Sequence, residues 1–172
     1  MTNLEKRARL WAIRWHDSIG QVRKYTGGAY WKHPEAVAEL VKTVPHTPEM
    51  VAAAYMHDVI EDTPCTEAEM REAFGDAVTD LVMWLTDVST PKDGNRDARK
   101  TIDRAHTAAA PREAKTVKLA DLIDNSRSIL ARDPDFAKVY LREKRLLLDE
   151  ALRDGDPTLW AQADQITRDA LG

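Results

Sequence analysis

About a third of the way along the chain, four residues that could bind a metal ion or move a proton lie within six positions of one another. His57 and Asp58 are adjacent, and Glu61 and Asp62 follow. On a helix, His57 would share a face with Glu61, and Asp58 with Asp62, because residues four apart are neighbours there. An imidazole beside a carboxylate can bind a divalent metal, and a further carboxylate can act as a base for water.

The apolar run before this segment sharpens the question of what the acids do. Residues 52–56 read Ala-Ala-Ala-Tyr-Met, which is typical of a buried helix. Burying several acids without partners is very unfavourable, and carboxylates at the C-terminal end of a helix oppose its dipole. Either the helix end emerges into solvent and the acids are simply hydrated, or a cation is bound there.

Helical periodicity extends over nearly the whole chain. Thr47-Pro48 is a typical helix start and Thr63-Pro64 a typical stop, so a helix is predicted from Pro48 to about Glu61. Thr66 and Glu69 have capping-box spacing and predict the start of another. Further helices are predicted over Arg96–Ala109, Pro111–Leu130, Asp135–Leu152 and Pro157–Leu171. No window alternates as a strand does, so the sequence predicts one all-α domain, residues 1–172, of roughly eight helices.

Composition excludes several classes of protein. The 172 residues carry a net charge of −4, which argues against a general nucleic-acid or anionic-membrane binder. The single cysteine, Cys65, excludes an internal disulfide framework and a cysteine-rich zinc site. No stretch has the length of a membrane span, and residues 1–7 do not resemble a secretory signal. We therefore expect a cytoplasmic protein with no nucleic-acid or membrane partner, in which local basic clusters could hold a small phosphorylated ligand.

The remaining histidines and one further acid differ in how much context they carry. His33 is a weaker candidate than His57, because an isolated histidine before a proline, here Pro34, is more often a helix-start residue. Asp121 is again a carboxylate that follows a mostly apolar segment, residues 117–120. The other three histidines do not lie between an apolar run and a carboxylate-rich segment, and they are interpreted as surface or packing residues. They are His16, His46 and His106.

Several segments taken in order resemble a known family. His33, His57-Asp58 and Asp121 look like the H…HD…D motif of HD-superfamily metal-dependent phosphohydrolases. The pair Glu61-Asp62 and the segment 117–127 resemble, more specifically, the hydrolase domain of the RelA/SpoT family and the small alarmone hydrolases. The opening segment from Ala12 to Ala38 and the segment 74–87 match as well.

The resemblance implies an HD-type helical bundle with one divalent ion, Mn²⁺. Its implied ligands are His33, His57, Asp58 and Asp121. Glu61 and Asp62 would orient or deprotonate the attacking water. The implied substrate contacts are Arg23 and Lys24 on the nucleotide, Arg99 and Lys100 on the phosphates, Asn125 on the ribose and Tyr140 in the nucleotide pocket. Apart from the resemblance, Arg99, Lys100 and Tyr140 would be interpreted as ordinary solvated or packing residues.

The function implied is removal of the 3′-pyrophosphate from a guanosine polyphosphate alarmone, giving GDP or GTP and pyrophosphate. A second hypothesis is hydrolysis of another nucleotide, such as a deoxynucleoside triphosphate or a phosphorylated dinucleotide. A third is a catalytically silent nucleotide-sensing module. The third is disfavoured because all of the matching ligand positions and the Glu61-Asp62 pair are present.

Overall fold

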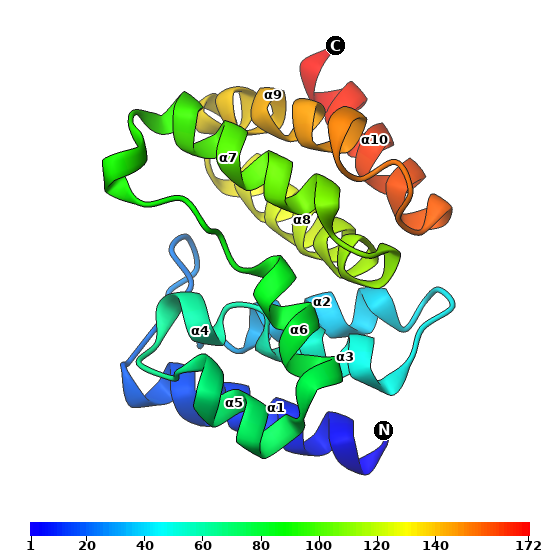
Figure 1. Ribbon diagram of the computed structural model, residues 1–172. Helices are drawn as coiled ribbons and strands as arrows, with labels where there is room; N and C mark the ends of the chain where they lie inside the picture. The colour runs from blue at the N-terminus through cyan, green and yellow to red at the C-terminus, as the bar shows by residue number, and fades with distance from the viewer. The chain divides into compact units, whose positions relative to one another are not determined.

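The computed structural model describes residues 1–172 and is built from α-helices, with one short 3₁₀ helix (Figure 1). Its one β-type pairing is an isolated antiparallel bridge between Val22 and Ala29. The prediction of an all-α protein is therefore confirmed. The α-helices number ten rather than roughly eight, mainly because short segments form helices of their own.

The chain divides into two compact units, the N-terminal unit Met1–Thr86 and the C-terminal unit Asp87–Gly172. The N-terminal unit contains α1 (Asn3–Ser18), α2 (Lys32–Val41), α3 (Pro48–Met56), α4 (Val59–Asp62), α5 (Glu67–Phe74) and α6 (Asp76–Leu85). The C-terminal unit contains η1 (Pro91–Asp93), α7 (Arg96–Ala109), α8 (Arg112–Arg132), α9 (Pro134–Glu150) and α10 (Pro157–Leu171). The prediction of a single domain over residues 1–172 stays a prediction.

In the N-terminal unit, α3 is the central element. Every residue from Met50 to Met56 is buried, so α3 is apolar all round and must be covered on several sides. It packs against α1, α2 and α6, and its run of three alanines fits close contact between helices. The end of this buried helix is where His57 and Asp58 lie, and α2 brings His33 to the same unit.

In the C-terminal unit, α8 has the corresponding role. It packs against α9 and α10, and its buried residues include Val117, Leu119, Ala120 and Asp121. The start of α10 is joined to α8 by a hydrogen bond of 3.0 Å from the backbone nitrogen of Asp156 to Thr116 Oγ1. The central helix of this unit thus carries a carboxylate, Asp121, among apolar neighbours.

Several predicted helix boundaries are confirmed. α7 and α10 have the bounds that were predicted, and the capping box of Thr66 and Glu69 is formed at the start of α5. The helix predicted from Pro48 to about Glu61 is wrong in one respect, because it is interrupted after Met56. No helix has the combination of length and apolar character that crossing a bilayer requires.

Candidate active site

The interruption after Met56 has a local cause in the His57 side chain. His57 Nδ1 lies 2.7 Å from the carbonyl oxygen of Ala54, so this nitrogen must be the donor. In an uninterrupted helix that carbonyl would accept from the backbone N–H of Asp58. The histidine side chain competes for the carbonyl, and Asp58 adopts φ −100° and ψ −3°, outside regular helical geometry. The chain then resumes in the short helix α4.

The break brings three metal-binding side chains together. His33, His57 and Asp58 each offer a ligand atom, and these atoms all lie within 4.8 Å of one another. Asp58 Oδ2 is 3.1 Å from His57 Nε2 and 3.8 Å from His33 Nε2. Both histidines are about 2% exposed, so the cluster is largely shielded from water. Of the predicted ligands, these three are thus brought together within one unit.

The donor set fits a divalent cation. Because His57 Nδ1 donates to Ala54, Nε2 carries either a lone pair or a second proton. A lone pair on His57 Nε2 would repel Asp58 Oδ2, which is 3.1 Å away. The arrangement therefore favours a cation, either a proton or a metal ion, between the two atoms. Mixed imidazole and carboxylate donors suit first-row divalent metals, and a carbonyl on the far ring nitrogen is the usual way to fix the orientation of such a ligand.

Tyr30 supports the carboxylate of this cluster. Its hydroxyl donates to Asp58 Oδ2 at 2.6 Å. The Tyr30 ring also contacts the rings of His16 and His33, with centroid separations of 4.8 and 6.0 Å. Tyr30 therefore restricts the orientation of Asp58 from the loop that precedes α2.

The acidic pair lies on α4, one turn beyond the cluster. Glu61 and Asp62 are both exposed by surface area. Asp62 Oδ2 accepts a hydrogen bond of 2.9 Å from Gln21 Nε2. The pKa of Asp62 is raised, first by partial burial of the carboxyl and then by the charge of Asp58, while the Gln21 hydrogen bond opposes the shift.

His16 is the feature of this site that the sequence did not reveal. It is fully buried, and its Nδ1 lies 2.7 Å from Gln21 Oε1, so one amide bridges His16 and Asp62. Burial lowers the pKa of His16, with the Gln21 hydrogen bond acting in the opposite direction. The available signal was the spacing of His16 and Gln21 across the end of α1, which indicates proximity but not a shared partner.

The remaining predicted ligand, Asp121, is a buried residue of α8 in the C-terminal unit. Lys118 Nζ donates to Asp121 Oδ2 at 3.0 Å, and Asn125 Nδ2 donates to Asp121 Oδ1 at 2.7 Å. Both oxygens are thus held by neighbours on the same helix. Asn125, predicted as a ribose contact, uses its amide nitrogen for Asp121.

The predicted nucleotide contacts Arg23 and Lys24 lie in the loop that follows α1. A turn forms this loop: the backbone nitrogen of Arg23 donates to Gly28 O at 2.8 Å, and Gly27 donates back to Arg23 O at 2.9 Å. Gly27 has φ +65°, a left-handed conformation that glycine adopts without strain. Lys24 is exposed and lies over the Tyr25 ring, 5.0 Å from its centroid.

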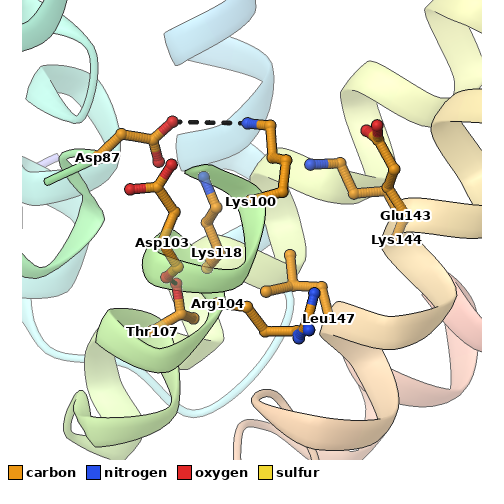
Figure 2. Close-up of a pocket in the computed structure, with 9 residues that line it drawn as sticks. All are labelled: Asp87, Lys100, Asp103, Arg104, Thr107, Lys118, Glu143, Lys144 and Leu147. Carbon is orange, nitrogen blue, oxygen red and sulfur yellow. Dashed lines mark hydrogen bonds and ion pairs between the residues drawn. The ribbon is translucent and has the colours of Figure 1, made fainter. Parts of the chain in front are cut away.

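The other predicted substrate residues lie in the C-terminal unit. Arg99 and Lys100 are half-buried on α7, and Lys100 lines a small cavity (Figure 2). Tyr140 is half-buried on α9, and burial raises the pKa of its phenol. These positions are compatible with contact to a ligand, and their predicted roles remain predictions.

A family model described as an HD domain matches residues 8–146. The chain belongs to the HD domain family. The match includes His33, the His57-Asp58 pair and Asp121, so the ligand positions all fall inside the part of this chain that carries the family pattern.

Curated relatives of this HD domain protein lie among enzymes of alarmone metabolism. Over 127 residues it is 37% identical to the guanosine-3′,5′-bis(diphosphate) 3′-pyrophosphohydrolase of Haemophilus influenzae and 33% identical to the bifunctional (p)ppGpp synthase/hydrolase SpoT of Escherichia coli. Over 120 residues it is 36% identical to the GTP pyrophosphokinase of Streptomyces coelicolor. These alignments cover 72%, 72% and 69% of this chain but 19%, 18% and 14% of the relatives. The chain thus spans less than a fifth of the length of these relatives.

Solved structures confirm the HD-domain fold. A structure described as a metazoan ortholog of SpoT that hydrolyses ppGpp matches with a TM-score of 0.85 and 26% identity, covering 98% of this chain and 96% of the other. Protein lmo0812 of Listeria monocytogenes matches with a TM-score of 0.66 and 24% identity, covering 86% of this chain and all of the other. The second likeness concerns the fold alone. The resemblance to RelA/SpoT hydrolase domains that the motifs indicated is confirmed.

Proposed function

We propose that this HD domain protein is an Mn²⁺-dependent phosphohydrolase that removes the 3′-pyrophosphate of the alarmones ppGpp and pppGpp. The observation that carries the proposal is the convergence of His33, His57 and Asp58, with Glu61 and Asp62 one turn away. The metazoan ortholog of SpoT, described as hydrolysing ppGpp, supports the choice of substrate.

The ligand set is proposed to contain Asp121 together with the three clustered residues. This part of the proposal rests on the family pattern in the sequence. A divalent ion, when bound, lowers the pKa of water and offsets phosphate charge. His57 and Asp58 would keep their orientations through the Ala54 carbonyl and the Tyr30 hydroxyl, so little reorganisation is needed.

Glu61 and Asp62 are the proposed proton acceptors. The water oxygen forms a bond to the phosphorus that carries the 3′-oxygen, and the bond between that phosphorus and the 3′-oxygen breaks. A carboxylate within hydrogen-bond reach of the water accepts the proton that the water loses and passes it to the 3′-oxygen, so the carboxylate is regenerated. The hydrogen bond from Gln21 holds the Asp62 carboxylate in one orientation, and the raised pKa of Asp62 makes it a better proton acceptor than an ordinary aspartate.

The substrate contacts of the proposal come from both units of the chain. Arg23 and Lys24 would contact the guanine nucleotide, and Arg99 and Lys100 its phosphates. Asn125 would contact the ribose through its amide oxygen, and Tyr140 would line the nucleotide pocket. All six are predicted from the resemblance, and their half-buried or exposed side chains are compatible with these roles.

A substrate panel assayed with Mn²⁺ tests the proposal. The panel contains ppGpp, pppGpp, deoxynucleoside triphosphates and phosphorylated dinucleotides, and the products are identified by chromatography. Pyrophosphate released with GDP or GTP supports the proposal. Triphosphate release from a deoxynucleotide, orthophosphate release from a dinucleotide, or no product from any member of the panel contradicts it.

A further inference from the structure

The turn that ends α1 folds the chain back onto His16. Gly20 has φ +62°, a left-handed conformation that glycine adopts without strain. Its backbone nitrogen donates to Asp17 O at 3.0 Å. The next backbone nitrogen, of Gln21, donates to His16 O, also at 3.0 Å. This pair of hydrogen bonds is the Schellman motif, which commonly ends a helix at a glycine, and it holds Gln21 beside the last turn of α1.

Asp62 determines which way the Gln21 amide points. Gln21 Nε2 lies 2.9 Å from Asp62 Oδ2, and an ionised carboxylate only accepts hydrogen bonds, so the N–H side of the amide faces it. The amide oxygen then faces His16 Nδ1 at 2.7 Å, and because this oxygen also only accepts, Nδ1 must carry a proton. The reverse orientation of the amide would require a proton on Asp62, which would then be no base.

The burial of His16 favours the same form of the ring. The imidazole is fully buried, and burial lowers its pKa, although the Gln21 hydrogen bond and the charges of Asp58 and Asp62 oppose the shift. A neutral ring with a single N–H is therefore favoured. Its Nε2 is buried and has no hydrogen-bond partner, so a proton there would be a buried donor without an acceptor, which is rare in proteins. The proton is thus placed on Nδ1 by a second, independent feature.

The network engages one oxygen of the Asp62 carboxylate. Gln21 donates to Oδ2, and no other hydrogen bond to this carboxylate is formed. Oδ1 is therefore left to accept a proton. If His16 did not hold the amide oxygen, the amide could turn over, and its oxygen would then face a carboxylate oxygen, which is a repulsive contact between two acceptors.

We propose that His16 is a positioning residue for the reaction and that it acts through the orientation of the Gln21 amide. Its Nδ1–H holds the amide oxygen, so the amide N–H faces Asp62 and keeps that carboxylate ionised and in one orientation. That Asp62 accepts a proton from water rests on the proposed function, whereas the orientation of the amide rests on the contacts of the three side chains.

Two replacements of His16 separate its hydrogen bond from its packing. In His16→Asn, the amide nitrogen is bonded to Cγ as Nδ1 is in histidine, so it can still donate to Gln21, whereas His16→Leu fills space and donates nothing. We expect His16→Leu to lower kcat for ppGpp about tenfold, with KM and Mn²⁺ affinity changed by less than about twofold, and His16→Asn to retain most of the wild-type kcat. His46→Leu, at an exposed histidine, is the control and should change none of the three.

A double replacement tests whether His16 acts through Gln21. If it does, His16→Leu combined with Gln21→Leu should lower kcat about tenfold, as each replacement does alone, and not about 100-fold. Additive losses would mean that His16 has an effect of its own. Either that result, or a His16→Asn variant as slow as His16→Leu, overturns the proposal.

Nitrogen-15 NMR of the wild-type chain locates the proton without any variant and without catalysis. Near neutral pH and with no divalent ion added, His16 should be a neutral imidazole with its proton on Nδ1. A proton on Nε2, or on both nitrogens, overturns the proposal. A proton on Nδ1 in a chain that hydrolyses no alarmone would support the hydrogen-bond network and contradict the proposed function.

Discussion

The two units of the chain concentrate different kinds of polar group. In the N-terminal unit, imidazole and carboxylate donors gather at the end of a buried helix, an arrangement that attracts a cation. In the C-terminal unit, lysines from three helices line one small cavity together with the carboxylates of Asp87, Asp103 and Glu143. The comparison shows that the HD motif accounts for the donor cluster of the N-terminal unit but not for the charged cavity of the C-terminal unit. Neither the HD motif nor the net charge of −4 indicates this cavity.

The largest effect is expected from replacing His57, a histidine of the donor cluster in the N-terminal unit. His57→Ala removes both a metal donor and the side chain that interrupts the helix, so we expect Mn²⁺ binding and hydrolysis to be abolished. Calorimetry and the ppGpp assay measure the two. His46→Ala is the control, because His46 is exposed and only bonds the carbonyl of Val44.

Replacing Asp121 by alanine, with the same two measurements, tests whether the C-terminal unit contributes a ligand to the cation. Asp121→Ala should also abolish hydrolysis and lower Mn²⁺ affinity if Asp121 is a ligand. Near-normal activity with an unchanged metal requirement would confine cation binding to the N-terminal unit and remove Asp121 from the ligand set.

The next effect separates proton transfer from metal binding within the N-terminal unit. Glu61→Gln keeps the size of the side chain but removes the base, and loss of a general base typically costs about 10²–10⁴-fold in rate. Mn²⁺ affinity should change little, because Glu61 lies one turn beyond the clustered donors. A variant that loses its metal instead would make Glu61 a ligand.

A smaller effect is expected at Gln21, which orients Asp62. Gln21→Leu removes a hydrogen bond that lowers the pKa of Asp62, so that pKa should rise further. The acidic limb of the kcat/KM profile should therefore move to higher pH, with a fall in kcat of about tenfold. Gln165→Leu removes a similar exposed hydrogen bond, to Asp169 in α10, and should leave the profile unchanged. An unshifted acidic limb in Gln21→Leu would mean that Asp62 is not the titrating group.

The smallest effect concerns Lys100 in the C-terminal unit. Lys100→Ala should raise KM for ppGpp several-fold without loss of metal, since the ion pair with Asp87 leaves much of the lysine charge uncompensated. Added salt should raise the wild-type KM more steeply than that of the variant, because one screened attraction has been removed. Equal salt dependence would place Lys100 outside the substrate contacts.

Helix limits could be predicted because they depend on neighbouring residues. Caps, prolines and apolar spacing determine α7, α10 and the start of α5, and these predictions are confirmed. The break between α3 and α4 could not be predicted, because it results from one side chain competing for a backbone carbonyl. The spacing of apolar residues does not depend on such a hydrogen bond and therefore cannot indicate it.

Features that depend on tertiary contacts also could not be predicted from the sequence. His16 was interpreted as a surface or packing residue; its burial is compatible with packing, but its link through Gln21 to Asp62 requires the fold. Lys144, which lines the small cavity of the C-terminal unit, was not singled out, because one lysine in a charged helix resembles any other until its neighbours on α7 and α8 are known. The division into two compact units was not predicted either.

Under the proposed function, the orientation of His57 by the Ala54 carbonyl would link metal supply to the lifetime of the protein. Its geometry exists only in the folded chain, so a cation held by this cluster binds the native state and not the unfolded one. At a concentration 100-fold above its dissociation constant, such a ligand adds about 2.7 kcal/mol to the free energy of unfolding. The unfolded fraction, on which proteolysis acts, then falls about 100-fold. Under the proposed function, a cell short of the metal would therefore lose the protein by turnover as well as its activity.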